Sequence, residues 1–327
     1  MPDALAPASL QTLLGEFELS RFLAEVYGQQ PLHQPAGNRP TRFQSLIDWA
    51  GLERLLNMPG CWDDARMRLV VDGRRIAPEH YCFALTGSEG DTRAWRPQPE
   101  RVMGAMQAGA TLVLNGLDGL VPAIGQLAHQ LESALSVRVQ SNLYWSRRGH
   151  RGLALHYDIH DVLALQIYGS KRWRLYAKRA QPGGKVPAER ELRAQAGGLA
   201  HEITLKPGDL LYLPAGVIHE AMAESDASLH LTLGLKQITP LDVASLVMRQ
   251  LSARADLAAP RYDLHEGAAA LSRHVGTLAA EFARVGRDPA ALAVLLAQIE
   301  ANRQPRGRYA LAPDPSATDG NRNADPQ

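Results

Sequence analysis

Apolar residues recur at helical spacing near the start of the chain. Over residues 10–27, leucine, phenylalanine and valine side chains lie three or four positions apart, which is the pattern of one or two amphipathic helices, and Pro31 ends it. A second run of this kind covers residues 43–56 and stops before the turn signal Pro59-Gly60. The pattern predicts an N-terminal helical region, residues 1–60, that packs on the core.

Short β-prone runs dominate the middle of the chain. Residues 67–76 predict a hairpin around an Asp-Gly turn, and a strand at 110–114 and a helix at 121–135 follow. Further along, strand-like runs alternate with Gly and Pro turns: VQSNLYW, DVLALQIY, KRWRLY, EITL, DLLYLP and SLHLTLGL. This pattern favours a mostly β core with α additions. We predict a double-stranded β-helix of the cupin or jelly-roll kind at residues 61–238.

The composition changes again after Pro240. Alanine and leucine become frequent and follow helical periodicity, so residues 239–310 predict a C-terminal helical region. These helices are a candidate interface for a homodimer. Residues 311–327 are rich in Pro, Asp, Asn and Gly and contain almost nothing apolar. Ordering them would cost backbone entropy without compensating burial, so we expect a disordered tail.

The composition is that of a folded globular protein. Among 327 residues, 45% are hydrophobic and 21% are charged, which argues against a disordered or fibrous chain. The net charge of +1 creates no overall field that would attract nucleic acid or an anionic membrane. No apolar run reaches the ~20 residues needed to cross a bilayer, so no membrane association is expected. The 2 cysteines are too few for a disulfide framework, which favours a cytoplasmic location.

The most informative short motif is His156-Tyr157-Asp158. Two residues separated by one position in extended chain point to the same side, so the imidazole and the carboxylate can share a metal ion. His219 follows a Pro-Ala-Gly turn after the DLLYLP run and supplies a third ligand, because a rolled-up barrel returns a late strand beside an early one. Two histidines and one carboxylate form the facial triad that holds Fe(II). His150 and His160 are the nearest competitors, and we interpret both as surface or pocket-rim residues.

Lys171 is the candidate cation for a co-substrate. The open positions of a facial triad suit a chelating dianion, whose far end would need a positive charge deeper in the barrel. Lys171 follows a Gly-Ser turn and shares strand parity with Trp173 and Leu175, which indicates an inward direction. The alternative is a solvated charge in the basic run Lys171, Arg172 and Arg174.

Three segments in order carry a family resemblance. The three segments are NLYWSRRGHRGLALHYDIHDVLALQIYGSKRWRLY, then PGDLLYLPAGVIHEA and then SLHLTLGL. They resemble the JmjC-type Fe(II)- and 2-oxoglutarate-dependent oxygenases, and within this family they are most similar to the cupin-4 branch that includes the ribosomal oxygenases. The resemblance is close over residues 142–235. It implies His156, Asp158 and His219 as the iron ligands and Lys171 as the partner of the distal carboxylate of 2-oxoglutarate. It further implies co-substrate roles for Asn142, Tyr144 and Thr232.

The resemblance also implies an activity: O2 and 2-oxoglutarate are consumed, succinate and CO2 are released, and a C–H bond of the substrate is hydroxylated. We expect a protein or peptide side chain as the substrate. Two alternatives stay open, namely a free amino acid or other small metabolite, and a non-catalytic cupin-like protein that binds a metal or ligand. Family members carry a winged-helix domain after their helical region, for which this chain has too few residues; that departure weakens the expectation of a ribosomal protein as substrate.

Three further features near the site remain ambiguous in the sequence. Asp161 either orients a metal ligand or caps a turn. The basic strip of Arg147, Arg148 and Arg151 either receives an acidic peptide or forms a solvated loop. The polar stretch 180–198 either covers the mouth of the barrel or leaves it open.

Overall fold

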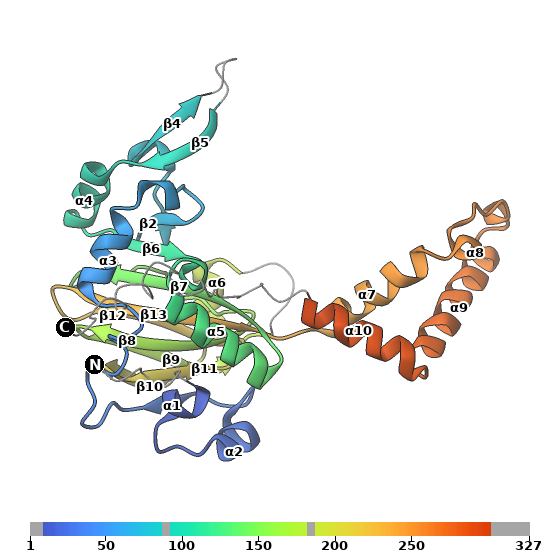
Figure 1. The fold of residues 1–327 in the computed structure, drawn as a ribbon, viewed down its shortest axis with the longest axis horizontal. Helices are drawn as coiled ribbons and strands as arrows, with labels where there is room; N and C mark the ends of the chain where they lie inside the picture. The colour runs from blue at the N-terminus through green and yellow to red at the C-terminus, as the bar shows by residue number, and fades with distance from the viewer. Residues whose placement is uncertain (1–8, 87–91, 182–186, 302–327) are drawn as a thin grey trace, which may run out of the picture.

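A computed structural model describes residues 9–86, 92–181 and 187–301 of the chain. A β core occupies the centre of the molecule, a β-hairpin projects from its top, and an arm of helices extends to one side (Figure 1). The predicted disordered tail, residues 311–327, lies outside the described residues.

Two antiparallel sheets make up the core. The large sheet has eight strands in the order β1-β11-β8-β13-β7-β6-β2-β3, and the small sheet has three in the order β10-β9-β12. A separate hairpin pairs β4 with β5. The strands are β1 (Leu32–Gln34), β2 (Met67–Val71), β3 (Arg74–Arg75), β4 (Cys82–Thr86), β5 (Thr92–Pro97), β6 (Thr111–Asn115), β7 (Arg138–Ser146), β8 (Asp161–Tyr168), β9 (Lys171–Arg179), β10 (Leu199–Leu205), β11 (Leu210–Leu213), β12 (Val217–Ala223) and β13 (Ser228–Lys236).

The burial pattern of the strands shows how the sheets face one another. Strands β8 and β13 are buried along almost their whole length, as expected for strands covered on both faces. Strand β9 alternates instead: Lys171, Trp173 and Leu175 point inward, while Arg172 and Arg174 are partly exposed on the outer face. The large and small sheets thus enclose the barrel interior, and the predicted double-stranded β-helix with helical additions is confirmed.

Helices cover the outer face of the large sheet and bury its leucines in one extensive apolar cluster. The N-terminal elements are α1 (Leu10–Leu14), α2 (Leu19–Arg21), a π-helical turn (Phe22–Val26) and α3 (Trp49–Leu56). They are followed by α4 (Pro99–Gln107) and α5 (Pro122–Leu135), while the short α6 (Glu189–Gln195) packs elsewhere, against the segments next to β12.

Several predicted boundaries were wrong. The helix expected over residues 43–56 begins only at Trp49, because the Asp48 carboxylate accepts a hydrogen bond from the Gly51 amide at 2.7 Å and so caps the helix there. Strand β12 was missed, since His219 and Glu220 interrupt its apolar pattern. The β4–β5 hairpin, α4 and α6 were also not predicted.

The turn before β12 requires a glycine. Gly216 has a φ of +83°, and a Cβ at this position would lie 2.2 Å from the carbonyl oxygen of Ala180. Any larger residue would be strained by its backbone conformation and by the contact. This turn sets the start of the strand that carries His219.

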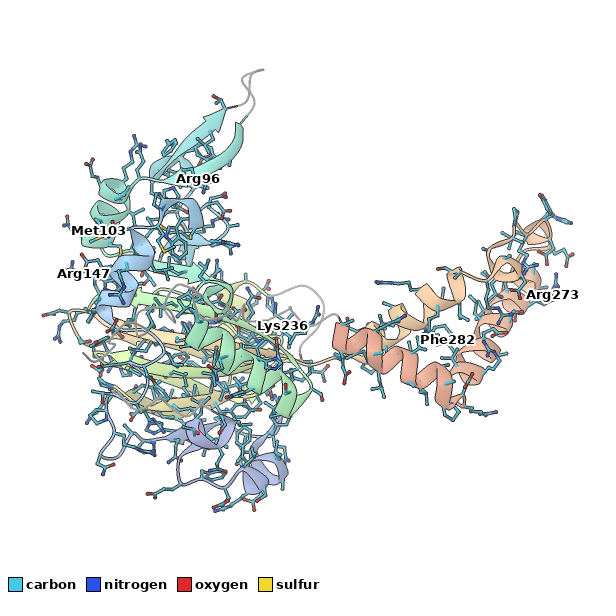
Figure 2. The ribbon with its side chains drawn as sticks, in the orientation of Figure 1. Arg96, Met103, Arg147, Lys236, Arg273 and Phe282 are labelled. Carbon is cyan, nitrogen blue, oxygen red and sulfur yellow. The ribbon has the colours of Figure 1, made fainter. Side chains whose placement is uncertain are left out.

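The C-terminal helices form an arm with a small core of its own. The arm comprises α7 (Pro240–Ser252), α8 (Ala255–Ala258), α9 (Ala268–Val285) and α10 (Pro289–Ala301), which stand clear of the β core in Figure 1. The buried residues of that core are Leu246, Val247, Leu251, Val285 and Leu295, and the partly buried Phe282 packs against them (Figure 2). Within the described ranges, no helix combines the length and the apolar character needed to span a membrane.

Candidate metal centre

Backbone hydrogen bonds join the two segments that carry the triad. The amide of His156 donates to the carbonyl of His219 at 3.1 Å, and the amide of His219 donates back to the carbonyl of His156 at 2.8 Å. His156 and Asp158 lie in an irregular segment before β8, whereas His219 is the third residue of β12. The isolated antiparallel bridge between His156 and His219 brings the three side chains together.

Both histidines are oriented by the same local hydrogen bond. The Nδ1 atom of His156 bonds to the carbonyl of Ala154 at 2.8 Å, and that of His219 bonds to the carbonyl of Val217 at 2.9 Å. Because a carbonyl oxygen only accepts, Nδ1 carries the proton in each ring. The Nε2 lone pairs remain for a metal ion, which is the arrangement that orients histidine ligands in metalloproteins.

The three side chains converge. One ligand atom from each of His156, Asp158 and His219 lies within 4.8 Å of the others, and the Nε2 atom of His219 is 3.7 Å from a carboxylate oxygen of Asp158. Burial, reinforced by the nearby His156, lowers the pKa of His219, so its ring is neutral at physiological pH. Two neutral imidazoles and a carboxylate fit a divalent first-row metal such as Fe(II).

Lys171 lines the same cavity. Its side chain is only 3% exposed, and its ammonium group donates to the hydroxyl of Ser146 at 3.1 Å. Burial lowers the pKa of Lys171 to about 7. In the part of the chain that the structure describes, no carboxylate forms an ion pair with it, which is unusual for a buried ammonium group.

The other predicted co-substrate residues line this cavity too. Tyr144 and Asn142 project from β7 and Thr232 from β13, beside the triad and Lys171. Burial raises the pKa of Tyr144, which therefore keeps its phenolic proton. The side-chain oxygen of Asn142 is buried and has no hydrogen-bond partner among the described residues. The cavity thus contains several polar groups that can form hydrogen bonds to a ligand.

Two further residues line the cavity that were not predicted as site residues, His230 and Trp173. The His230 ring stacks on Tyr144 with a centroid distance of 4.7 Å, and its edge meets Trp173 at 5.7 Å. Each of the two rings has a buried nitrogen without a hydrogen-bond partner in the described structure. The sequence signal that could have indicated His230 is its strand parity with Thr232 on β13. Its pairing with Tyr144 across the sheet is visible only in the structure.

Asp161 holds the turn before β12. Its carboxylate accepts from the Tyr212 hydroxyl at 2.5 Å and from the Ala215 amide at 2.8 Å, while the Gly216 amide donates to the carbonyl of Asp158 at 2.8 Å. Its contribution is therefore to the turn that leads into β12, and neither ligand histidine bonds to it. His160 lies on the rim of the cavity, with its Nδ1 bonded to the Asp161 carbonyl.

The segment 180–198 contributes its helix to the back of the site. Leu192 and Ala196 pack against Leu155, Tyr157 and Ile218, the residues that alternate with the three ligands and point away from them. Residues 182–186 of the segment lie outside the described ranges. Helix α6 thus supports the ligand segments from behind, and it does not cover the cavity.

The basic strip is largely neutralised. Arg151 lies 3.4 Å from Glu220 and 3.7 Å from Glu189, and Arg148 pairs with Asp226 at 2.9 Å. Glu220 also accepts from the Tyr176 hydroxyl at 2.6 Å. These contacts favour a structural role for Arg151 on the outer face of the small sheet over a free anion-binding strip.

Comparison with known proteins agrees with this geometry. Residues 120–243 match the family model of the JmjC domain. The chain is 30% identical over 241 residues to ribosomal oxygenase 2 of Mus musculus, a match that covers 71% of this chain and 48% of the relative. It is 35% identical over 233 residues to the bifunctional lysine-specific demethylase and histidyl-hydroxylase NO66 of Dictyostelium discoideum, covering 70% and 43%. The chain thus spans about half the length of these relatives.

A solved structure shares the fold. The ribosomal oxygenase YcfD of Escherichia coli, determined in complex with cobalt and 2-oxoglutarate, superposes with a TM-score of 0.59 at 18% identity, covering 88% of this chain and 72% of YcfD. The fold, the matched segment and the converging triad define a JmjC domain. The sequence relatives place it in the ribosomal-oxygenase-like branch of that family, as the resemblance implied.

Metal binding tests the triad directly. Asp158→Ala or His219→Ala removes one of three ligands and should lower Co(II) affinity by more than the ~10–100-fold that loss of an outer hydrogen bond costs. The absorption spectrum of bound Co(II) and titration calorimetry measure this loss. His160→Ala is the matched control, since this histidine lines the cavity but is not one of the three. Tight Co(II) binding by Asp158→Ala would place the metal elsewhere.

Proposed function

We propose that this chain is an Fe(II)- and 2-oxoglutarate-dependent oxygenase that hydroxylates a side chain of a protein or peptide. The observation that carries the proposal is the presence of a two-histidine, one-carboxylate triad and an unpaired buried lysine in one cavity. A metal ion alone would not require the lysine, and an anion alone would not require the triad.

Each residue has a defined task in this proposal. His156, Asp158 and His219 hold the iron on one side and leave its other positions open. Lys171 pairs with the distal carboxylate of 2-oxoglutarate, and its contact with Ser146 fixes the direction of the ammonium group. The phenol of Tyr144 and the hydroxyl of Thr232 donate hydrogen bonds to the same co-substrate, and the amide of Asn142 orients it.

The iron and 2-oxoglutarate together supply the oxidising power that inserts one oxygen atom from O2 into a C–H bond. The protein binds and orients the substrate and keeps bulk water from the barrel interior. The buried Trp173 and Leu175 on β9 serve that exclusion. A protein substrate is supported by the names of the relatives, which include a histidyl-hydroxylase and ribosomal oxygenases. A cytoplasmic location fits the cysteine usage.

Turnover decides between this function and its alternatives. The purified full chain is incubated with Fe(II), ascorbate and 2-oxoglutarate, together with a cell extract separated into peptide and small-molecule fractions. We expect succinate formation and the gain of one oxygen atom by a component of the peptide fraction, detected by mass spectrometry. His156→Ala and Asp158→Ala should abolish both signals, while His160→Ala should retain them.

The other outcomes each contradict part of the proposal. Oxygen gained only by a small molecule would show an oxygenase of free metabolites with the same iron site. Tight metal binding without succinate formation in any fraction would indicate a binding protein of the cupin type.

Lys171 makes co-substrate binding depend on pH. With its pKa lowered to about 7, the lysine is largely neutral above pH 7 in the free protein, and a bound carboxylate restores the charge. Binding then takes up a proton, so the affinity for 2-oxoglutarate should fall between pH 7 and pH 9 by up to ~10-fold per unit, and the lysine should cause no change below pH 7. Calorimetry in buffers of different ionisation enthalpy measures both the affinity and the proton uptake.

Two variants separate the charge from the rest of the site. Lys171→Met should weaken 2-oxoglutarate binding by ~10–100-fold and leave Co(II) affinity unchanged. Lys171→Arg should keep binding but lose the pH dependence, because the guanidinium stays charged. An affinity of the native protein that is constant from pH 7 to pH 9 would contradict the assignment of Lys171.

We also propose that the helical arm forms a homodimer. Large apolar side chains are exposed on all three long helices of the arm, and a monomer would leave them in water. On α9, Leu271 and Val275 are 58% and 57% exposed and lie one turn apart on the same face. The other exposed apolar residues of the long helices are Leu241, Val243, Met248, Leu292, Val294 and Leu296.

The mass in solution tests the dimer. The full chain should have twice its monomer mass by light scattering, and Leu271→Glu with Val275→Glu should convert it to a monomer at micromolar concentration. Ser272→Glu, an exposed polar position on α9, is the control and should remain dimeric. A monomeric native chain would refute this proposal and leave the oxygenase proposal untouched.

A further inference from the structure

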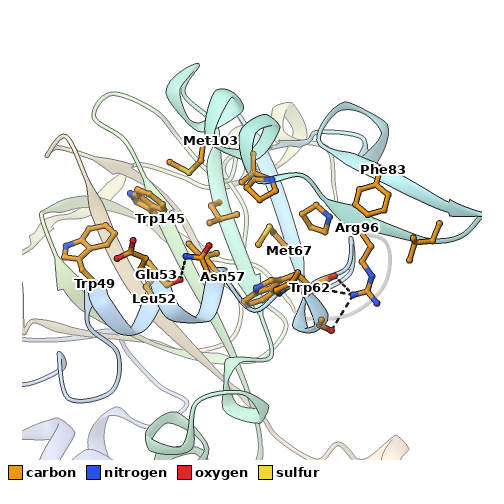
Figure 3. Close-up of a pocket in the computed structure, with 18 residues that line it drawn as sticks. Trp49, Leu52, Glu53, Asn57, Trp62, Met67, Phe83, Arg96, Met103 and Trp145 are labelled. Carbon is orange, nitrogen blue, oxygen red and sulfur yellow. Dashed lines mark hydrogen bonds between the residues drawn. The ribbon is translucent and has the colours of Figure 1, made fainter.

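A large cavity of the described structure lies apart from the metal centre. It has a volume of about 800 Å³ and is bounded by α3, α4, the β4–β5 hairpin and the strands β2, β6 and β7 (Figure 3). On β7, Tyr144 lines the metal cavity, while the next residue, Trp145, lines this second cavity. The two cavities thus lie on opposite faces of one strand.

The walls of this cavity are almost entirely apolar. Trp49, Trp62 and Trp145 surround it together with Leu52, Met67 and Val102. The indoles of Trp49 and Trp145 meet edge to face at 5.3 Å and form one end of it. A concave apolar space of this size, with few polar groups, is typical of a site for a small molecule.

The rim is also apolar. Phe83 on β4 is 43% exposed, Leu85 38% and Met103 on α4 42%, and all three side chains face this opening. Such residues cost free energy when they stay hydrated, and a contiguous group of them around a cavity marks a binding surface. An apolar ligand would cover both the walls and part of the rim.

Two charged side chains lie at opposite ends of the cavity (Figure 3). One guanidinium nitrogen of Arg96 donates to the carbonyls of Trp62 at 2.7 Å and of Pro59 and Gly60 at 3.4 Å, which fixes the group in place. Among the described residues, the other N–H groups of Arg96 form no hydrogen bond or ion pair. Glu53, at the other end, repels an anion, so the charges orient a ligand with its negative end at Arg96.

We propose that this cavity binds a small apolar carboxylate. The aliphatic or aromatic body of the ligand lies among the tryptophans, and its carboxylate accepts hydrogen bonds from the free N–H groups of Arg96. A small molecule is favoured over a peptide because walls from helices, strands and a hairpin enclose the space on several sides. This site is independent of the proposed oxygenase function, since none of the three metal ligands lines it.

Decanoate and decanol are the probes, because they share a chain and differ in charge. Three tryptophans line the cavity, so intrinsic fluorescence reports occupancy and calorimetry gives the stoichiometry. We expect one decanoate per chain, bound at least ~10-fold more tightly than decanol. Arg96→Gln, which keeps an N–H donor for the loop carbonyls, should abolish this preference for the acid.

A substitution that fills the cavity with a larger side chain provides a second test of ligand binding. Gly60 lines the cavity, and a Cβ there would have no atom within 4 Å, so Gly60→Phe should block the site without disturbing the fold. Gly198→Phe is the matched control, because a Cβ at Gly198 is equally free and lies outside the cavity. Thermal unfolding checks that both variants fold.

The proposal predicts that Gly60→Phe loses decanoate binding while Gly198→Phe retains it. Equal binding by Gly60→Phe and the native chain would overturn it, as would equal affinity for decanoate and decanol. A change from dimer to monomer in Gly60→Phe would also overturn it, because a second copy of the chain would then be the occupant.

Discussion

The metal centre depends on one antiparallel pair of backbone hydrogen bonds. The bridge between His156 and His219 joins an irregular segment before β8 to the third residue of β12, 63 positions later in the chain. Together with the hydrogen bond from the Gly216 amide to the Asp158 carbonyl, it fixes the positions of the two imidazoles relative to each other. Each ring is itself oriented by a carbonyl two residues earlier in its own segment. Asp161 and Gly216 serve this bridge, because together they determine how β12 leaves the preceding turn.

The second constraint is the burial of a lysine without an acid. Transferring an ammonium group into an apolar interior costs free energy unless an anion accompanies it. The hydrogen bond from Lys171 to the Ser146 hydroxyl offsets part of that free energy. The same hydroxyl accepts a hydrogen bond from Thr111 at 3.1 Å. The remaining free energy of burial lowers the pKa of Lys171, which shifts the lysine toward its neutral form. A protein that had only to be stable would place an apolar residue here, which supports the proposal that Lys171 binds a ligand.

The sequence predicted the barrel and the cluster of His156, Asp158 and His219 well, because both depend on local signals. Strands such as DVLALQIY and SLHLTLGL are continuous apolar runs, and the parity of Lys171 with Trp173 indicated its direction. Strand β12 escaped prediction because the polar His219 and Glu220 interrupt its short apolar run. His230 was overlooked for a different reason: its contact with Tyr144 depends on cross-strand register, which no local pattern specifies. The cavity beside α3 is lined by residues from four separate parts of the chain, so no short sequence pattern predicts it.

The packing of α6 has a consequence for how such a centre changes over time. Leu155, Tyr157 and Ile218 contact α6 through side chains that alternate with the ligands along the same backbone segments. A substitution in this peripheral helix, at Leu192 or Ala196, therefore shifts the backbone that bears the ligands while the ligands themselves stay the same. Variation at these buried contacts can in this way adjust the spacing of the coordinating atoms.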